Sequence, residues 1–232
     1  MKWTIKTASD FVGGLSTPSK MPSFGTSTPA EFCRVGSELA KVEGTTCSKC
    51  YARKGLYQFP NVKAALSHRY DIVKACEHDS EHADKWVGAF EFLLNTRLER
   101  ALARGFNGSN DPGFFRWHDS GDLIGLFHLR LIVRVAEATP NVCHWLPTRE
   151  LSTVRAYLRE AGSFPPNLRV RLSAAKIDKL PPTVEGCSGS AVHSTPEPLA
   201  GAIGCPAYTQ QGECRDCRAC WLSDDVISYP QH

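Results

Sequence analysis

The C-terminal part of the chain contains three cysteines with the spacing of metal ligands. Two residues separate Cys214 from Cys217, and two more separate Cys217 from Cys220. This spacing lets successive thiolates bind one metal centre. A fourth thiol is available upstream at Cys205, which precedes Pro206. The segment therefore predicts a site with four thiolate ligands.

A second cysteine pair lies in the N-terminal part of the chain. Cys47 and Cys50 are also two residues apart, a spacing that occurs in metal sites and in redox-active thiol pairs. With the C-terminal thiols, this pair predicts one [4Fe-4S] cluster, or two if Cys33 and Cys187 also take part. Zinc is the alternative metal, because tetrahedral zinc sites use the same thiolates at the same spacing.

Polar side chains gather where three predicted strands end. These strands, one opening the stretch 114–122 and the others at 142–146 and 168–173, alternate with segments of helical periodicity at 123–138 and 152–161. This alternation predicts an α/β fold with a parallel sheet. Parallel strands end at one edge of a sheet, so we expect their polar ends to form one site there. Catalytic residues are expected at His118, Asp119, Ser120, Asp122 and Arg149, and residues that bind a cofactor or substrate at Arg116, Thr148 and Ser173.

The residue types at these strand ends suggest acid–base chemistry on an anion. His118 and Asp119 could transfer protons or contact a cluster or substrate, and Arg149 could bind a phosphate or carboxylate through its planar guanidinium. Adjacent residues of a strand point to opposite faces, so His118, Asp119 and Ser120 cannot form a hydrolytic triad by themselves. Either Ser120 or Asp122 is expected to cap the following helix.

Composition distinguishes two parts of the chain. Residues 1–180 form the predicted α/β body, which includes the first cysteine pair and an N-terminal segment rich in Ser, Thr, Gly and Pro. In that segment Lys20 is either an anion contact or an ordinary solvated lysine. From residue 181, Pro, Gly, Ser and Cys dominate, so 181–232 predicts a cysteine-rich, loop-rich metal-binding tail packed on the body. Two further amphipathic helices are expected at 61–82 and 85–104.

Overall composition excludes several classes of protein. The 232 residues suffice for a sizeable core, and the net charge of +3 is too small to indicate nucleic-acid binding by itself. No apolar run approaches the roughly 20 residues of a membrane span, and the N-terminus lacks the apolar core of a signal peptide. We therefore expect a cytoplasmic protein without a membrane partner. In a reducing compartment, its ten cysteines favour metal ligation over disulfides.

Six short motifs occur in a distinctive order along the chain. They are STPSKMP at 16–22, CYARKG at 50–55, RWHDSGD at 116–122, PTR at 147–149, CPA at 205–207 and CxxCxxCW at 214–221. This order resembles that of the gene product 88 family of phages and bacteria, and the resemblance implies the host-cell cytoplasm if the protein is phage-encoded. The layout is also similar to a reduced radical S-adenosylmethionine barrel, which implies a partial (β/α) barrel carrying an iron–sulfur cluster. A CxxxCxxC motif and a Gly-Gly-Glu stretch are absent, so binding of S-adenosylmethionine is not implied.

Two functions fit these observations, and they belong to different classes. The first is an iron–sulfur enzyme or redox protein that acts on an anionic small molecule at the strand ends and exchanges electrons with a partner. The second is a zinc-stapled phage protein that binds nucleic acid or protein without catalysis. Its basic patch would consist of Arg53, Lys54, Arg215 and Arg218. A hydrolase that uses the residues after the first strand ranks third, because they cannot form a triad alone.

Overall fold

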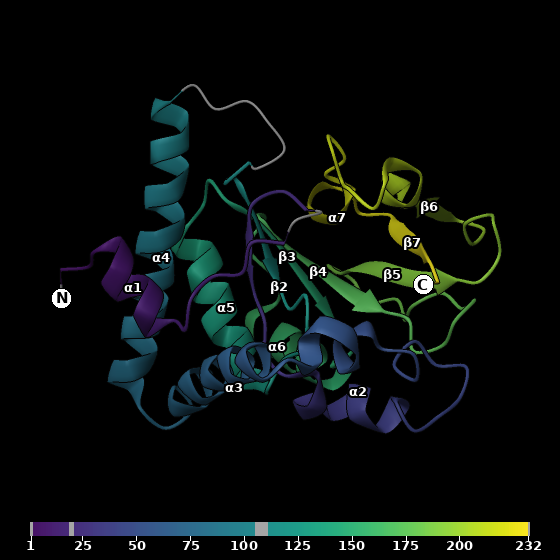
Figure 1. Ribbon diagram of the computed structural model, residues 1–232, viewed down its shortest axis with the longest axis horizontal. Helices are drawn as coiled ribbons and strands as arrows, with labels where there is room; N and C mark the ends of the chain where they lie inside the picture. The colour runs from purple at the N-terminus through teal and green to yellow at the C-terminus, as the bar shows by residue number, and fades with distance from the viewer. Residues whose placement is uncertain (1, 19–20, 105–110, 232) are drawn as a thin grey trace.

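The structure is a computed structural model that describes residues 2–18, 21–104 and 111–231. At the centre of this part of the chain is a parallel sheet of seven strands in the order β1-β2-β3-β4-β5-β7-β6 (Figure 1). The predicted α/β class and parallel sheet are therefore confirmed. The strands are β1 Phe24–Thr26, β2 Phe114–Trp117, β3 Cys143–Thr148, β4 Leu168–Ser173, β5 Ser188–His193, β6 Ala202–Gly204 and β7 Val226–Pro230.

Helices surround the sheet, and their starts carry local signals. The α-helices are α1 Ile5–Phe11, α2 Arg34–Leu39, α3 Pro60–Ala75, α4 Ser80–Ala103, α5 Leu126–Ala138, α6 Leu151–Ala161 and α7 Ala219–Leu222, and 3₁₀ helices lie at Ala30–Phe32, Tyr51–Arg53, Gly55–Gln58 and Pro206–Gln210. Helix α3 begins at Pro60, whose ring fixes a helical φ. Helix α4 is capped by Asp79, which accepts a hydrogen bond from the backbone N–H of His82 at 2.9 Å. No helix in the described segments is long and apolar enough to cross a membrane.

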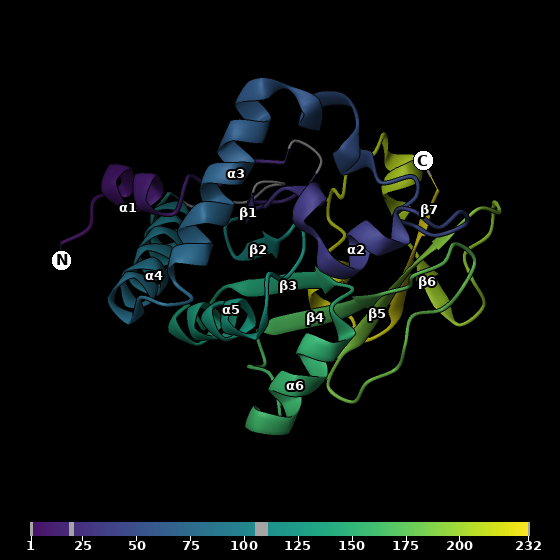
Figure 2. The ribbon, with the colours of Figure 1, turned by 90° about the horizontal axis from the view of Figure 1, so that it is seen from below.

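The sheet is wound in one direction through its first five strands. β1 to β5 lie side by side in the order in which they occur along the chain. Helices α5 and α6, which connect β2 to β3 and β3 to β4, lie on the same face of the sheet (Figure 2). This winding is that of (β/α) barrels and differs from doubly wound sheets, whose strand order reverses. The strand order ends at β1 and β6 in the described residues, so the sheet is open.

The main core lies between the sheet and the helices of this first face. Alternate residues of β2 point to it, because side chains of a strand alternate between faces. Phe115 and Trp117 are fully buried there. The Trp117 ring stacks on Trp86 of α4, with ring centroids 6.0 Å apart, and contacts Phe90 of the same helix at 5.3 Å. The other residues of β2, including Arg116, therefore face the opposite side of the sheet.

The C-terminal segment covers that second face. Trp221 of α7 packs edge-on against Trp145 of β3, with ring centroids 5.2 Å apart. Its indole N–H donates to the backbone carbonyl of Phe115 at 2.9 Å. Cys220 and Ile227 complete a second buried cluster. A large apolar contact of this kind fixes the C-terminal segment to the sheet.

The expectation that the tail lacks regular structure was wrong. Strands β5, β7 and β6 extend the sheet beyond β4, and all are parallel to their neighbours. β5 (SGSAVH) and β6 (AIG) are rich in Ser, Gly and Ala, so they lack the alternation that marks a half-buried strand. Their own strand propensity is weak, and pairing with β4 and with β7 determines their conformation.

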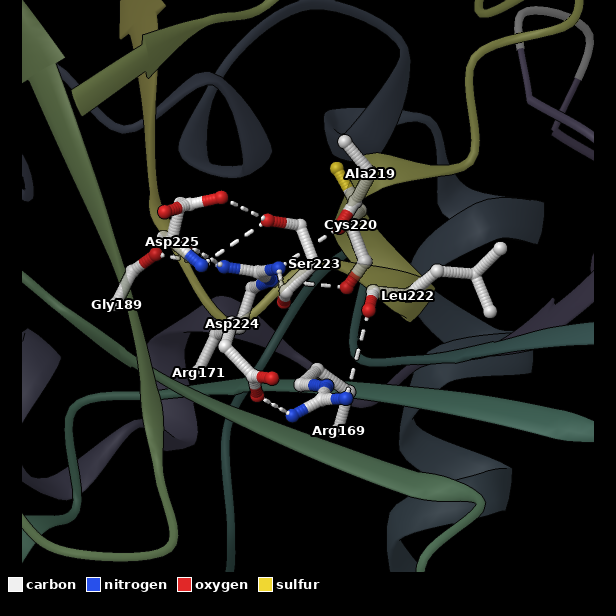
Figure 3. Close-up of polar contacts among 9 residues, drawn as sticks. All are labelled: Arg169, Arg171, Gly189, Ala219, Cys220, Leu222, Ser223, Asp224 and Asp225. Atoms are coloured by element: carbon white, nitrogen blue, oxygen red, sulfur yellow. Dashed lines mark hydrogen bonds and ion pairs between the residues drawn. The ribbon is translucent and has the colours of Figure 1, made fainter.

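A buried arginine holds the tail in place. Arg171 of β4 is fully buried, and its guanidinium donates only to backbone carbonyls (Figure 3). Nε donates to Cys220 at 2.8 Å, and the two terminal nitrogens donate to the carbonyls of Gly189, Ala219, Ser223 and Asp225. Five donors in a fixed plane suit such a set of acceptors. The contacts tie the α7 segment to the sheet.

Candidate functional site

His118 lies directly after β2 in an unusual conformation. Its φ is 57°, in the left-handed region, which costs roughly 1–3 kcal/mol for a residue with a side chain. The ring is buried, and neither of its nitrogens has a hydrogen-bond partner within the described part of the chain. Burial, with smaller contributions from His128 and Arg116, lowers the pKa of His118 well below its usual value. The imidazole is therefore neutral, with two unused nitrogens.

Asp119 is held by two tyrosines that sequence reasoning missed. Its Oδ2 accepts a hydrogen bond from the hydroxyl of Tyr57 at 3.2 Å, and its backbone carbonyl accepts one from Tyr51. The other carboxylate oxygen is buried and has no partner among the described residues. Burial and then the nearby Asp119 raise the pKa of Tyr57, so its hydroxyl stays protonated. The only available signal was that Tyr51 directly follows Cys50 in the CYARKG motif.

Arg116 brings a buried positive charge to the second face of the sheet. Its guanidinium lies over the ring of Trp145, 4.4 Å from the centroid, an arrangement that favours a cation. Burial would lower the pKa of Arg116, but Tyr51, Asp119 and Tyr229 outweigh it and raise the pKa above its usual value. Its Nε has no partner within the described residues. A cation with a free donor is therefore available beside Asp119.

Ser120, Asp122 and Thr148 connect the turns at the strand ends. The hydroxyl of Ser120 donates to the carbonyl of Thr28 at 3.0 Å. Asp122 Oδ1 accepts from the Thr148 hydroxyl at 2.6 Å and from a backbone N–H at 2.8 Å, and Oδ2 accepts from the backbone N–H of Arg149 at 2.9 Å. Burial nevertheless raises the pKa of Asp122. These groups already use their hydrogen-bonding capacity within the protein, so they can position neighbours.

Arg149 and Glu150 lie at the end of β3, next to the segment that follows β1. Arg149 Nη2 donates to the hydroxyl of Thr46 at 2.6 Å. The adjacent Glu150 is almost fully buried, accepts a hydrogen bond from the backbone N–H of Val35 at 2.9 Å, and has a pKa raised mainly by burial. Its contact to α2 could not be predicted, because the two residues are 115 positions apart in the chain. Both residues attach the N-terminal cysteine segment to the sheet.

Of the remaining predicted binding residues, Ser173 lies apart from these contacts. Ser173 ends β4, and its hydroxyl is 3.1 Å from that of Ser190 on β5. Lys20 lies outside the described residues. The structure therefore gives Ser173 a partner on the next strand.

Three thiols form the N-terminal cysteine group, defined as Cys33, Cys47 and Cys50. The sulfur atoms of Cys33 and Cys47 each lie 3.6 Å from the position that a Cβ on Gly36 would take, so they are close neighbours. The backbone N–H of Cys50 donates to the carbonyl of Cys47 at 3.2 Å in a tight turn. Burial, followed by Asp122 and the other two thiols, raises the pKa of Cys33 to about 12.

Four thiols form the C-terminal cysteine group, defined as Cys205, Cys214, Cys217 and Cys220. Burial raises the pKa of Cys214 to about 11 and that of Cys220 to about 12, and Cys205 adds to both shifts. Cys217 in turn affects Cys205 and Cys214. The sulfur of Cys220 is 3.0 Å from the hydroxyl of Tyr229. All four predicted C-terminal ligands are therefore near one another.

The two groups have different surroundings. Asp122 and Arg149 lie near Cys47 of the N-terminal group, whereas Arg171 and Tyr229 lie near Cys220 of the C-terminal group. Among the described residues, those that shift the pKa of Cys47 include Cys50 and none of the C-terminal thiols with which the pair was expected to combine. The described residues contain no set of three or more His, Cys, Asp or Glu side chains that could hold a metal ion. The predicted metal-binding character of the tail is therefore not supported by these side chains as they stand.

Cys187 belongs to neither group. Burial alone raises its pKa to about 11, and its side chain packs at the margin of the main core. No other thiol of the described residues contributes to this pKa shift. Cys187 is therefore a suitable reference with which the grouped cysteines can be compared.

Comparison with known proteins gives a family. The family model described as gene product 88 matches residues 3–223. No curated protein and no solved structure matches the chain. The match spans both cysteine groups and all the strand ends described above. The chain belongs to the gene product 88 family.

Proposed function

We propose that this protein is an iron–sulfur protein whose C-terminal cysteine group holds a [4Fe-4S] cluster. The observation that carries the proposal is the gathering of four thiols, from 205 to 220, on the second face of the sheet. Arg171 donates to the backbone carbonyl of Cys220, and the backbone N–H of Cys205 donates to the carbonyl of Ser228 on β7. A donor set of four thiolates suits iron–sulfur clusters and zinc, and few other metals.

A cluster and a zinc site differ in the distances they require between the thiols. In a tetrahedral zinc site, a Zn–S distance of about 2.3 Å requires sulfur atoms roughly 3.8 Å apart. Each thiolate of a [4Fe-4S] cluster binds a different iron atom, so its ligands lie farther apart. The C-terminal thiols influence one another's ionisation, and metal analysis distinguishes the two centres.

The ionisation of the thiols argues against a disulfide-exchange function. Reactive thiol pairs have lowered pKa values and electropositive surroundings. Here burial raises the pKa of Cys47, Cys214 and Cys220. Such thiols are protonated and weakly nucleophilic without a metal, and metal binding displaces their protons. They therefore suit ligation better than redox exchange.

The chemistry we propose takes place on an anionic small molecule at the carboxyl edge of the sheet. Arg116 would supply positive charge, and the neutral ring of His118 would accept or donate a proton. Asp119, with one oxygen lacking a partner in the described chain, is the second candidate for proton transfer. The cluster would accept electrons from a partner protein or donate electrons to it.

The zinc-stapled nucleic-acid-binding protein remains the second candidate. Two arginines of its expected basic patch are hydrogen-bonded within the protein, which weakens the case for this function. Arg53 donates to the carbonyl of Ala30 and the hydroxyl of Ser37, and Arg218 donates to the carbonyl of Cys217. Basic side chains that are hydrogen-bonded within the protein are less available to neutralise the phosphates of a nucleic acid.

Metal analysis of protein purified without oxygen tests the proposal. Wild-type protein should contain iron and sulfide and absorb broadly near roughly 400 nm, as thiolate-bound clusters do. Cys214→Ser should lose the iron held by the C-terminal group, whereas Cys187→Ser should retain it, because Cys187 has no thiol neighbours that affect its ionisation. A colourless protein with stoichiometric zinc, or equal iron in both variants, would contradict the proposal.

A further inference from the structure

Three arginines share one face near the end of α4. Arg97, Arg100 and Arg104 follow one another at intervals of three and four residues, which places their side chains on the same side of a helix. Like charges at this spacing repel one another. Glu99, the only acidic residue between 92 and 104, is neither three nor four positions from any of them. The helix therefore gathers three positive charges and supplies no carboxylate on that face.

The rest of the described chain does not balance these charges. None of the ion pairs in the described segments includes any of the three arginines, and residues 105–110 contain no Asp or Glu. The next carboxylate along the chain, Asp111, accepts a hydrogen bond from a backbone N–H at 2.9 Å. The helix dipole favours cations at a C-terminus, which accounts for Arg100 and Arg104. It does not account for Arg97, which lies before the last turn.

The three arginines border a cavity of about 370 Å³. Its other lining residues in the described chain are apolar or aromatic, and they are Ile5, Phe24, Ala101 and Pro112. The guanidinium of Arg97 lies over the ring of Phe24, with its central carbon 3.9 Å from the ring centroid. Its Nε is buried and has no partner among the described residues. Apolar walls with a few polar donors are typical of a pocket that binds a small molecule.

This cavity lies at the edge of the sheet where the strands begin. Phe24 is the first residue of β1, and Pro112 comes two residues before β2, which runs parallel to β1. Ile5 begins α1, which packs on α4, and the last turns of α4 extend beyond α1 in Figure 1. His118 and Asp119, which belong to the proposed function, follow the opposite end of β2. The cavity is therefore separate from that site.

We propose that the cavity binds a nucleoside di- or triphosphate, with its phosphate groups on Arg100 and Arg104 and its base against Phe24. Planar guanidinium groups bind phosphate oxygens through two parallel hydrogen bonds. A single carboxylate would neutralise one of three cations, whereas a di- or triphosphate carries enough charge for all of them. A nucleobase is flat and stacks on aromatic rings, so it suits the apolar walls. The proposal does not involve the cysteines, so it and the proposed cluster can fail separately.

Calorimetric titration of protein purified without oxygen tests the role of the charges. At least one of ATP, GTP, CTP and UTP should bind, and Arg100→Met/Arg104→Met should raise its Kd at least about tenfold through the loss of two charge-assisted contacts. The matched control is Arg155→Met/Arg159→Met, which removes two exposed arginines four positions apart on α6 and changes the net charge equally. Its Kd should stay within about twofold of the wild-type value. Binding of none of the four nucleotides at about 1 mM, or equal weakening in both double variants, would overturn the proposal.

The apolar walls have a separate test. Pyrophosphate carries phosphate charge without a base, so it should bind about tenfold more weakly than the nucleotide. Phe24→Leu removes the aromatic ring and should weaken binding of the nucleotide, while the Kd of pyrophosphate stays within about twofold. Equal affinities of the wild type for nucleotide and pyrophosphate would overturn the contact with the base. Tighter binding of a short 5′-phosphorylated oligonucleotide than of any free nucleotide would contradict a free nucleotide as the ligand.

Discussion

Replacing His144 with glutamine should make the stability of the protein less dependent on pH. His144 is fully buried on β3; its Nδ1 accepts a hydrogen bond from the indole N–H of Trp117 at 3.2 Å, and its Nε2 lies 2.8 Å from the hydroxyl of Thr139. That hydroxyl donates to the carbonyl of Val135, so the ring proton belongs on Nε2. Burial lowers the pKa of His144 to about 3. A second ring proton, on Nδ1, would also face the indole N–H of Trp117, and this repulsion likewise lowers the pKa of His144.

The size of the effect follows from linkage between protonation and folding. An imidazole in the unfolded chain has a pKa of about 6.5, so below that pH the unfolded chain binds a proton that folded His144 does not. The contribution to stability is complete above about pH 6.5 and is lost as the pH falls towards 3. From about pH 7.5 to about pH 5.5 the loss from this side chain is about 1.4 kcal/mol. Buried Asp122 and Glu150, whose pKa values are raised, act in the opposite direction, so only the difference between wild type and variant isolates His144.

Urea unfolding of both proteins at the two pH values provides the measurement. Between about pH 7.5 and about pH 5.5, the free energy of unfolding of the wild type should fall by about 1.4 kcal/mol more than that of His144→Gln. This difference does not depend on how much the substitution destabilises the protein at neutral pH. His68→Gln is the control, because His68 is exposed on α3 and meets similar solvent in the folded and unfolded states. A difference below about 0.5 kcal/mol between wild type and His144→Gln would refute the buried, neutral state of this ring.

Two further variants test contacts that hold the site. Arg171→Met should destabilise the protein by at least about 3 kcal/mol in urea unfolding, since five backbone carbonyls lose their donor. Arg169→Met, in contrast, removes an ion pair to an exposed carboxylate and should cost less than about 1 kcal/mol. Gly121 and Gly44 have φ values of 83° and 75°, but only at Gly121 would a Cβ collide with Thr28, at 2.0 Å from its hydroxyl oxygen. In thermal unfolding, Gly121→Ala should therefore be about 1–3 kcal/mol less stable than Gly44→Ala.

Strong periodicity explains which elements could be predicted. The apolar run before His118 forms β2, and the segments expected at 142–146 and 168–173 form β3 and β4. In β2 and β4 the apolar residues of the main core stand at alternate positions, which is the periodicity of a strand. Helix α1 was not expected, although Thr4 and Thr7 form a capping box at its start. Its β-branched residues favour a strand, and the cap outweighs them.

The local roles of the polar residues could be predicted only in part. Their position at one edge of the sheet followed from the winding of parallel strands. The left-handed φ of His118 and the complete burial of Arg171 depend on neighbours far along the chain, such as Thr26, whose carbonyl accepts from the His118 N–H, and the α7 segment. The division of the cysteines into two groups likewise depends on where two separate segments meet the sheet. No spacing rule contains that information.

Arg116 is influenced by residues from the surroundings of both cysteine groups. Tyr51, directly after Cys50, donates to the carbonyl of Asp119, and Asp119 and Cys220 both raise the pKa of Arg116. In a site of low dielectric, a change of one charge is felt strongly by neighbouring ions. An electron added to a cluster at the C-terminal group would therefore strengthen the hold of Arg116 on its proton and weaken its attraction for Asp119. Arg116 and Asp119 are therefore the groups through which the charge of a C-terminal cluster would influence proton transfer at the strand ends.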